Sequence, residues 1–183
     1  NHSQFYEPAQ AERMSRATVN DFPSPAGRLI EEKLGYVLLP TFDSGDRDQK
    51  ALFAITVQKI IRDIDNQSPC GWIVDLQGNR GGSSPSMLAG IGPILGEGRV
   101  GSFLTASRSA DRELQSLNWF YENGSFRKEQ EVGRPIEVNG GGYKLKKPDP
   151  PVAILTGELT ASAAEAVVVA FSGRPNTHRF GMA

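Results

Sequence analysis

A serine stands at the start of a predicted helix, directly after a short apolar run. Residues 151–155 (PVAIL) are followed by residues 160–165 (TASAAE) and then by an Ala- and Val-rich stretch. This order predicts a strand, a tight turn and a helix, with Ser162 at or just before the first helical turn. Unpaired backbone N–H groups and the positive end of the helix dipole gather there, so a hydroxyl can attack a carbonyl while neighbouring amides bind the oxyanion. Ser162-x-x-Glu165 is also a capping box, and local spacing alone favours that structural role.

A glycine-rich loop forms the second candidate site. Residues 75–82 (DLQGNRGG) follow a buried apolar run and precede a predicted helix, where open α/β sheets bind their ligands. Glycines there let the backbone approach a substrate and aim N–H groups at an anion. Neither Gly-x-Gly-x-x-Gly nor Gly-Lys-Ser/Thr is present, which argues against nucleotide binding. A structural turn and an oxyanion-binding loop both remain open, and Arg80 fits either a site for a substrate carboxylate or a solvated charge.

Strands and helices alternate along the chain, so the sequence predicts an α/β layer structure. Turn and N-cap residues at 43–46 precede a helix with one apolar face. The strands at 71–76 and 151–156 are expected to be neighbours, with Gly81, Gly82 and Ser162 at the same edge of one sheet. The predicted elements are a strand pair between Leu29 and Leu39 broken near Gly35, a helix at about 48–65, a strand at 71–76, a helix at 85–95, a strand at 102–105, weak strands within 107–147, a strand at 151–156, a helix at 162–172 and a strand beginning near His178.

Composition restricts the classes of function. The chain of 183 residues has a net charge of -1 and 38% apolar residues, which suits one globular domain. No basic run interleaved with aromatic residues is found, so a nucleic-acid partner is not expected. No apolar stretch reaches membrane-spanning length. The single Cys70 is expected to be a buried free thiol, and no Cys/His cluster has zinc spacing.

Three blocks together resemble the C-terminal processing (tail-specific) serine peptidase family. They are residues 71–82 (GWIVDLQGNRGG), 155–166 (LTGELTASAAEA) and 173–181 (GRPNTHRFG), and the resemblance covers roughly 28–183. It implies a ClpP/crotonase-like fold of stacked β-β-α units, a peptide or protein substrate, no metal or organic cofactor, and a location outside the cytoplasm. It also implies that Ser162 is the nucleophile and that the oxyanion hole consists of the N–H of Ala163 and of Gly81 or Gly82.

The same resemblance divides the chain into two parts. Residues 1–27 are expected to be an irregular segment with Pro8, Pro23 and Pro25 and a His-Ser motif, and residues 28–183 to be the peptidase core. Both ends look truncated, because the chain begins without methionine and stops in what is predicted to be the start of a strand.

The general base distinguishes two branches of the family. Members with a Ser-Lys dyad carry the lysine just after a Phe-Gly pair, but here Met182 follows that pair and no lysine lies beyond Ser162. The branch that resembles the tricorn core and retinoid-binding-protein repeats uses a histidine from an upstream His-Ser segment, and His2-Ser3 is similar to it. The resemblance therefore implies His2 as the base, while His178 is expected to be a surface-strand residue.

Two other functions remain open at this stage. The fold also serves as a non-catalytic ligand- or peptide-binding module, and a crotonase-like acyl-CoA enzyme uses the same kind of oxyanion loop on a thioester. The second would need a surface for adenine and phosphates, and no clear basic cluster offers one. Glu165 is expected to cap the helix, Asp75 to be structural at a strand end, and Trp72 to belong to the core.

Overall fold

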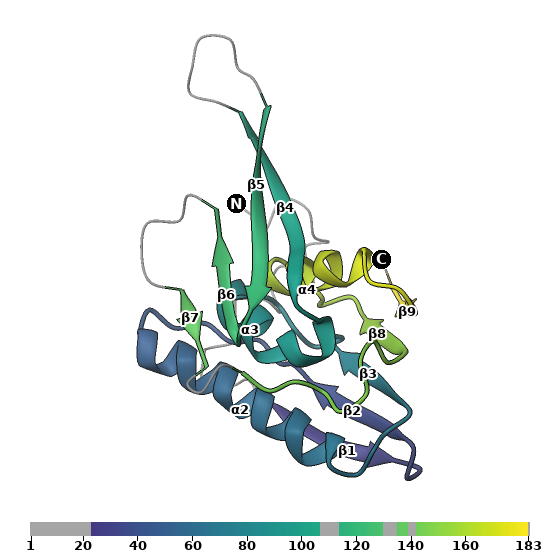
Figure 1. The fold of residues 1–183 in the computed structure, drawn as a ribbon. Helices are drawn as coiled ribbons and strands as arrows, with labels where there is room; N and C mark the ends of the chain where they lie inside the picture. Colours follow the sequence, from purple (N-terminus) through teal and green to yellow (C-terminus); the bar gives the residue numbers. More distant parts are fainter. Residues whose placement is uncertain (1–22, 107–113, 130–134, 139–141, 183) are drawn as a thin grey trace.

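The fold is built on a five-stranded sheet whose central strands are parallel. The computed structural model describes residues 23–106, 114–129, 135–138 and 142–182. The strand order is β1-β2-β3-β8-β9; β1 runs antiparallel to β2, and every later pair is parallel (Figure 1). The strands are β1 (Ala26–Ile30), β2 (Leu34–Leu38), β3 (Gly71–Asp75), β8 (Val152–Thr156) and β9 (Thr177–Gly181).

A second sheet of four antiparallel strands stands on the other side of the helices. It is a meander in the order β4-β5-β6-β7, and its β4–β5 hairpin projects from the body of the molecule (Figure 1). Its strands are β4 (Gly98–Ala106), β5 (Leu114–Glu122), β6 (Ser125–Lys128) and β7 (Ile136–Glu137).

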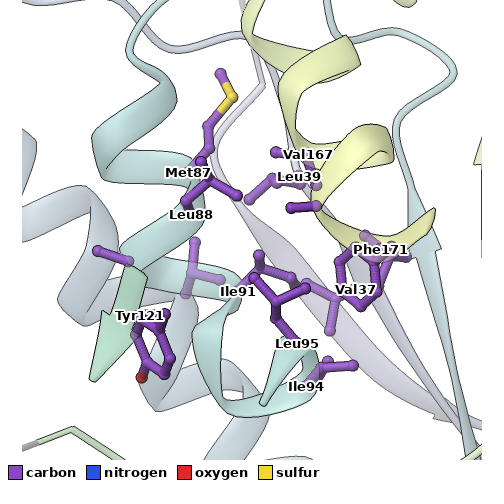
Figure 2. Packing of buried hydrophobic residues seen from close by; sticks show 14 of the residues in the cluster. Val37, Leu39, Met87, Leu88, Ile91, Ile94, Leu95, Tyr121, Val167 and Phe171 are labelled. Carbon is purple, nitrogen blue, oxygen red and sulfur yellow. The ribbon is translucent and has the colours of Figure 1, made fainter. Parts of the chain in front are cut away.

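The helix α3 (Ser84–Leu95) lies between the two sheets and supplies the central residues of the hydrophobic core. It is buried from Ser86 to Leu95, and it packs against α2 (Arg47–Asp65), α4 (Ala163–Ser172) and β5 to β7. A helix that is apolar all round belongs in an interior, which explains its position. Figure 2 shows its side chains between those of β2, α4 and Tyr121. The labelled core residues are Val37, Leu39, Met87, Leu88, Ile91, Ile94, Leu95, Tyr121, Val167 and Phe171.

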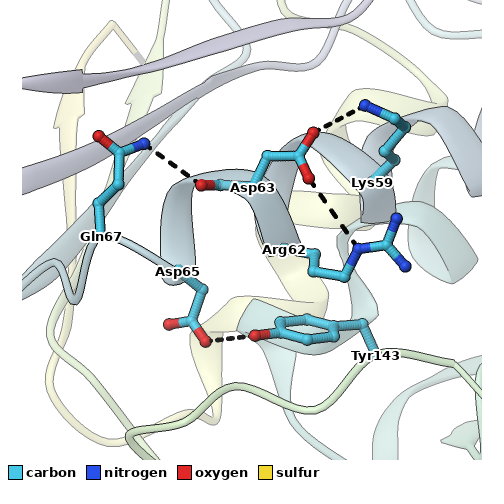
Figure 3. Close-up of polar contacts among 6 residues, drawn as sticks. All are labelled: Lys59, Arg62, Asp63, Asp65, Gln67 and Tyr143. Carbon is cyan, nitrogen blue, oxygen red and sulfur yellow. Dashed lines mark hydrogen bonds and ion pairs between the residues drawn. The ribbon is translucent and has the colours of Figure 1, made fainter.

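Polar contacts fasten the segment before β8 to α2. Asp65 is 3% exposed and accepts hydrogen bonds from the Tyr143 hydroxyl at 2.6 Å and the Lys146 N–H at 2.9 Å (Figure 3). The buried Gln58 accepts from the Tyr143 N–H at 2.8 Å. Burial and the bond to Asp65 raise the pKa of Tyr143 to about 12.

Most predicted elements are confirmed. The apolar face of α2 is buried at Phe53, Val57, Ile61 and Ile64, and Asp46 caps the helix by accepting from the Gln49 N–H at 2.9 Å. Trp72 is 2% exposed, as expected for a core residue. None of the helices in the described ranges is long and apolar enough to cross a membrane.

Two local predictions were wrong. The first strand pair turns at residues 31–33, where Glu31 and Glu32 have φ of 49° and 55°, and not near Gly35. Gly35 lies inside β2 instead, where a Cβ would come within 2.6 Å of the Trp72 ring. Cys70 is exposed and not buried, because it lies in the connection before β3 begins.

Candidate active site

The loop after β3 and the turn after β8 lie side by side at one edge of the five-stranded sheet. β3 and β8 pair in parallel, from Trp72 with Val152 to Asp75 with Leu155, so both segments leave the sheet in the same direction. A Cβ on Gly81 would lie only 2.8 Å from the Cβ of Ser162. The prediction that the glycine loop and Ser162 meet at one edge is confirmed.

Ser162 lies at the N-cap of α4 in an unusual backbone conformation. Its φ is 54° and its ψ is -114°, a region that L-residues rarely adopt. Such strain costs about 1–3 kcal/mol and clusters at functional sites. The side chain is half-buried at the start of the helix, where N–H groups converge.

Glu165 acts as a helix cap, as predicted. Its carboxylate accepts a hydrogen bond from the Ser162 N–H, three residues back in the chain. This bond occupies the N–H of the serine itself and places a negative charge in the first turn of α4, where it complements the helix dipole. The Ala164 N–H donates to Ala161 O at 3.0 Å, and the Glu165 N–H donates to the Ser162 side chain in the capping box, so the remaining candidate donor at the start of α4 is the N–H of Ala163.

The N–H of Ala163, in the first turn of α4, donates to no protein acceptor in the described part of the chain. It lies next to the glycine loop, because a Cβ on Gly81 would come within 3.1 Å of the Ala163 nitrogen. An N–H donor at a helix start, beside a hydroxyl, is the arrangement that an oxyanion hole requires.

The two glycines of the loop have different roles. Both have positive φ, 103° for Gly81 and 114° for Gly82. The Gly81 N–H donates to the Asn79 side chain at 2.8 Å. Gly82 forms a parallel bridge with Phe42. In this bridge the Phe42 N–H donates to Gly81 O, and the Phe42 carbonyl accepts from the Ser83 N–H.

The direction of the Gly82 N–H follows from that bridge. In a parallel bridge, the residue between the two bonded neighbours turns its own N–H away from the partner strand. β3 lies between β2 and β8, so the side away from Phe42 is the side of the nucleophile turn. Across the described ranges, Gly82 donates to no acceptor. Of the two glycines, Gly82 is therefore the one whose N–H is available to a ligand.

Two polar residues that the sequence analysis did not single out connect the loops. The Thr160 hydroxyl donates to Leu76 O at 2.8 Å and accepts from the Gly157 N–H at 2.9 Å. Asn79 is buried under the glycine loop. The available signal was an amide side chain within a glycine-rich loop that directly follows a buried strand, since an amide that becomes buried there requires partners.

Arg80 and Asp75 flank the loop. The Arg80 N–H donates to the Thr41 hydroxyl at 2.7 Å, and its side chain is half-buried. Asp75 is 9% exposed and accepts from the Tyr36 hydroxyl at 2.6 Å and the Gln77 N–H at 2.9 Å, which is a structural role as expected. Burial, with the bond to Asp75, raises the pKa of Tyr36 to about 12.

The two histidines are far apart in the sequence, and only one is described. His2 lies outside the described residues. His178 is exposed on the edge strand β9, as predicted for a surface-strand residue. Met182 follows β9, where its N–H donates to Thr156 O at 3.3 Å and its side chain is exposed.

Two surface hollows lie away from these loops. Their volumes are about 260 and 430 Å³, and they share Glu97, Asp149 and Arg174 among their lining residues. Neither is lined by the glycine loop or by Ser162. The candidate active site is therefore defined by its donors and its hydroxyl, not by either hollow.

A serine with positive φ beside a glycine loop, at one edge of an α/β sheet, is an arrangement suited to hydrolase chemistry, and comparison with known proteins identifies the family. Residues 33–183 match the model of Peptidase family S41. The chain belongs to this family of peptidases, which confirms the resemblance seen in the sequence and the α/β, ClpP/crotonase-like fold class.

Individual relatives are more distant. The nisin-resistance protein of Lactococcus lactis subsp. lactis is 33% identical over 118 residues, which is 61% of this chain and 31% of that protein. A lipoprotein from Streptococcus agalactiae has a similar fold, with a TM-score of 0.66 and 21% identity over 94% of this chain and 52% of that chain. The chain thus spans about a third of the curated relative and about half of the solved one.

Proposed function

We propose that this protein is a serine peptidase that cleaves peptide bonds through an acyl-enzyme, with Ser162 as the nucleophile. The observation that carries the proposal is the strained Ser162 at the start of α4, so close to Gly81 that a Cβ on that glycine would lie 2.8 Å from the Ser162 Cβ. Family membership supports the peptidase class. A hydroxyl that served only as a cap would need neither the positive φ nor the neighbouring free N–H groups.

The reaction follows the acyl-transfer scheme. The base takes the proton of the Ser162 hydroxyl while its oxygen attacks the substrate carbonyl. The tetrahedral intermediate then collapses, the C–N bond breaks, and the leaving amine takes the proton back from the base. Water, deprotonated by the same base, hydrolyses the ester and releases the serine.

The oxyanion hole is assigned to the N–H groups of Ala163 and Gly82. Gly81, also considered from the sequence, donates to Asn79 and is better suited to shaping the loop. Removing one oxyanion donor from such a site costs about 10²–10³ in rate, so the two backbone groups matter as much as the base.

His2 is assigned as the general base. Met182, whose thioether cannot take up a proton, follows the Phe-Gly pair, at the position where the Ser-Lys branch carries its lysine. An imidazole with an ordinary pKa of about 6.5 can accept the serine proton near neutral pH. His178 is the weaker candidate because its side chain is exposed on an edge strand.

The substrate is proposed to be a peptide or protein acted on outside the cytoplasm. The curated relative is named for nisin resistance and the solved one is called a lipoprotein, and both names support an extracytoplasmic setting. Nisin is therefore the first substrate to test. Arg80, beside the glycine loop, is proposed to bind a substrate carboxylate, for which a guanidinium is well suited.

Labelling with a fluorophosphonate tests the nucleophile. The full-length wild-type protein should be labelled at Ser162, and Ser162→Ala should abolish both labelling and nisin cleavage. Ser172→Ala is the matched control, because Ser172 is an exposed serine at the other end of the same helix. Labelling that persists in Ser162→Ala would contradict the proposal.

A further inference from the structure

We propose that Asn79 is the positioning residue that holds the oxyanion loop against the nucleophile turn. It is not itself a catalytic group, because it acts through the backbone of Gly81 and Ala161. The inference rests on the proposed serine peptidase function and adds to it the residue that sets the geometry of the oxyanion hole.

The side chain of Asn79 is buried and forms hydrogen bonds through both its nitrogen and its oxygen. The residue is 1% exposed. Its Nδ2 donates to Leu39 O at 2.9 Å and to Pro40 O at 3.1 Å, and it lies 3.6 Å from the sulfur of Met87. Its Oδ1 accepts from the Gly81 N–H at 2.8 Å. The amide therefore joins the segment after β2 to the glycine loop.

The backbone of Asn79 makes the third connection. Its carbonyl accepts from the N–H of Ala161 at 3.1 Å, and Ala161 directly precedes Ser162. The segments that follow β2, β3 and β8 are thus all bonded to one residue. Because these strands are neighbours in that order, Asn79 lies at the middle of the edge that forms the site.

The consequence concerns which glycine N–H faces the substrate. Asn79 takes the Gly81 N–H, and the Phe42 N–H donates to Gly81 O at 3.3 Å. These two bonds fix the peptide planes on both sides of Gly81. The Gly82 N–H is then held on the side of Ser162. Oxyanion donors are effective only when they are held in place before the charge develops.

The chemistry of the site requires an amide. Two carbonyl oxygens on one side need donors, and an N–H on the other side needs an acceptor, which only an uncharged amide supplies together. An aspartate of the same shape keeps the acceptor and loses both donors. An alanine leaves two carbonyls and one N–H without partners.

The competing explanation is that Asn79 only stabilises the folded loop. Gln58 offers a matched control, since it is another buried amide, 3% exposed. It donates to Ala89 O at 2.8 Å and accepts from the Tyr143 N–H, away from the glycine loop. Loss of either amide removes a similar set of buried hydrogen bonds, but only Asn79 touches the site.

The experiment compares Asn79→Ala with Gln58→Ala in the full-length protein. For Asn79→Ala, kcat and the rate of fluorophosphonate labelling should both fall by about 10- to 100-fold, while KM changes by less than about threefold. Gln58→Ala should lower the melting temperature by about as much as Asn79→Ala does, but its kcat and its rate of labelling should equal those of the wild type. Wild-type kcat in folded Asn79→Ala, or an equal loss of kcat in Gln58→Ala, would overturn the proposal.

A second variant covers the case in which Asn79→Ala does not fold. In Asn79→Asp, the buried carboxyl faces Leu39 O and Pro40 O, so its protonated form is favoured and can donate to one of them. Labelling of Asn79→Asp should therefore fall as the pH rises, whereas wild-type labelling should not. A wild-type pH profile in this variant would refute the positioning role.

The outcomes also separate this inference from the function on which it rests. If the wild type is not labelled at Ser162, both the proposed function and the role of Asn79 fail. If Ser162 is labelled in the wild type and at the same rate in Asn79→Ala, only the role of Asn79 fails.

Discussion

Ser162 has a backbone conformation that an ordinary helix cap does not need. The caps of the other two described helices, Asp46 and Ser83, have extended backbones with φ of -79° and -84°. Ser162 has φ of 54° and ψ of -114° instead. The contrast within one molecule separates the start of α4 from the other helix starts and supports the assignment of the nucleophile.

Replacing Ser162 tests whether this conformation is strained. Ser162→Gly and Ser162→Ala both remove the hydroxyl, but only glycine adopts the positive φ without cost. Ser162→Gly should be more stable than Ser162→Ala, and the difference should exceed that between Asp46→Gly and Asp46→Ala by about 1–2 kcal/mol. Denaturant unfolding measures all four. Equal differences at the two caps would show that Ser162 is not strained.

The general base gives a prediction at the same scale. In the proposed mechanism a neutral His2 accepts the serine proton, and this mechanism predicts that kcat/KM decreases as the pH falls through an apparent pKa of about 6–7. His2→Ala should lower kcat/KM by about 10²–10⁴. The control, His178→Ala, should retain nearly all activity. Wild-type turnover in full-length His2→Ala would refute the assignment and favour a Ser-Lys dyad.

At the scale of elements, the neighbouring parallel strands β2, β3 and β8 create the site. Parallel strands bring their C-terminal ends to one edge, so the segments from residues 39–42, 76–82 and 157–162 lie in a row. The Tyr36–Asp75 hydrogen bond links β2 to the end of β3, directly before the glycine loop. The strength of this hydrogen bond therefore affects how rigidly β2 and β3 are held together at the edge of the sheet that carries the candidate site.

The Tyr36–Asp75 hydrogen bond should make the free energy of unfolding depend on pH in the alkaline range. Burial and the bond to Asp75 raise the pKa of Tyr36 to about 12 in the folded protein, above its ordinary value of 10.0. A group whose pKa is higher in the folded than in the unfolded state contributes its full stabilisation when the pH is below the unfolded pKa. This contribution is lost as the pH rises through the folded pKa. The stability difference between wild type and Tyr36→Phe should thus be constant below pH 10 and shrink towards pH 12.

Urea unfolding from pH 8 to about 12 would measure this difference. Far-UV circular dichroism at each pH would establish that both proteins begin folded. A difference that stayed constant throughout this range would contradict the raised pKa.

At the scale of the whole molecule, α3 joins the two sheets. One side of it faces the five-stranded sheet and α4, and the other faces the meander (Figure 2). Gly92 permits the close approach on the meander side, because a Cβ there would come within 2.0 Å of the Tyr121 ring. Tyr121 is 2% exposed, and its hydroxyl accepts a hydrogen bond from Gln58 at 3.2 Å, which helps to hold the ring in place.

Gly92→Ala should therefore destabilise the protein by about 1–3 kcal/mol through overpacking. The loss should occur although alanine is favoured in helices by about 1 kcal/mol. Gly45→Ala is the control, since a Cβ there meets nothing within 4 Å. Thermal unfolding of the two variants measures the effect. A Gly92→Ala protein as stable as wild type would show that the contact at Tyr121 relaxes freely.

Much of the architecture could be predicted from local patterns. The apolar spacing of Phe53, Val57 and Ile61 predicted α2, and the apolar runs at 71–76 and 151–156 predicted two buried strands. Parallel pairing then required Ser162 and the glycine loop to meet. These features depend on residues close in the sequence, whose side-chain periodicity directly reflects local backbone geometry.

Other features depended on contacts between distant residues. The choice between Gly81 and Gly82 as the free donor is decided by Asn79 and Phe42, which come from the loop itself and from the segment after β2. The turn at Glu31 and Glu32 likewise depends on the register between β1 and β2, and the exposure of Cys70 depends on where β3 begins to pair with β2. The sequence by itself determined which residues are candidates for the chemistry. The tertiary structure decided which N–H groups remain available at the candidate site, because each N–H is either occupied or free according to the acceptors that the fold brings beside it.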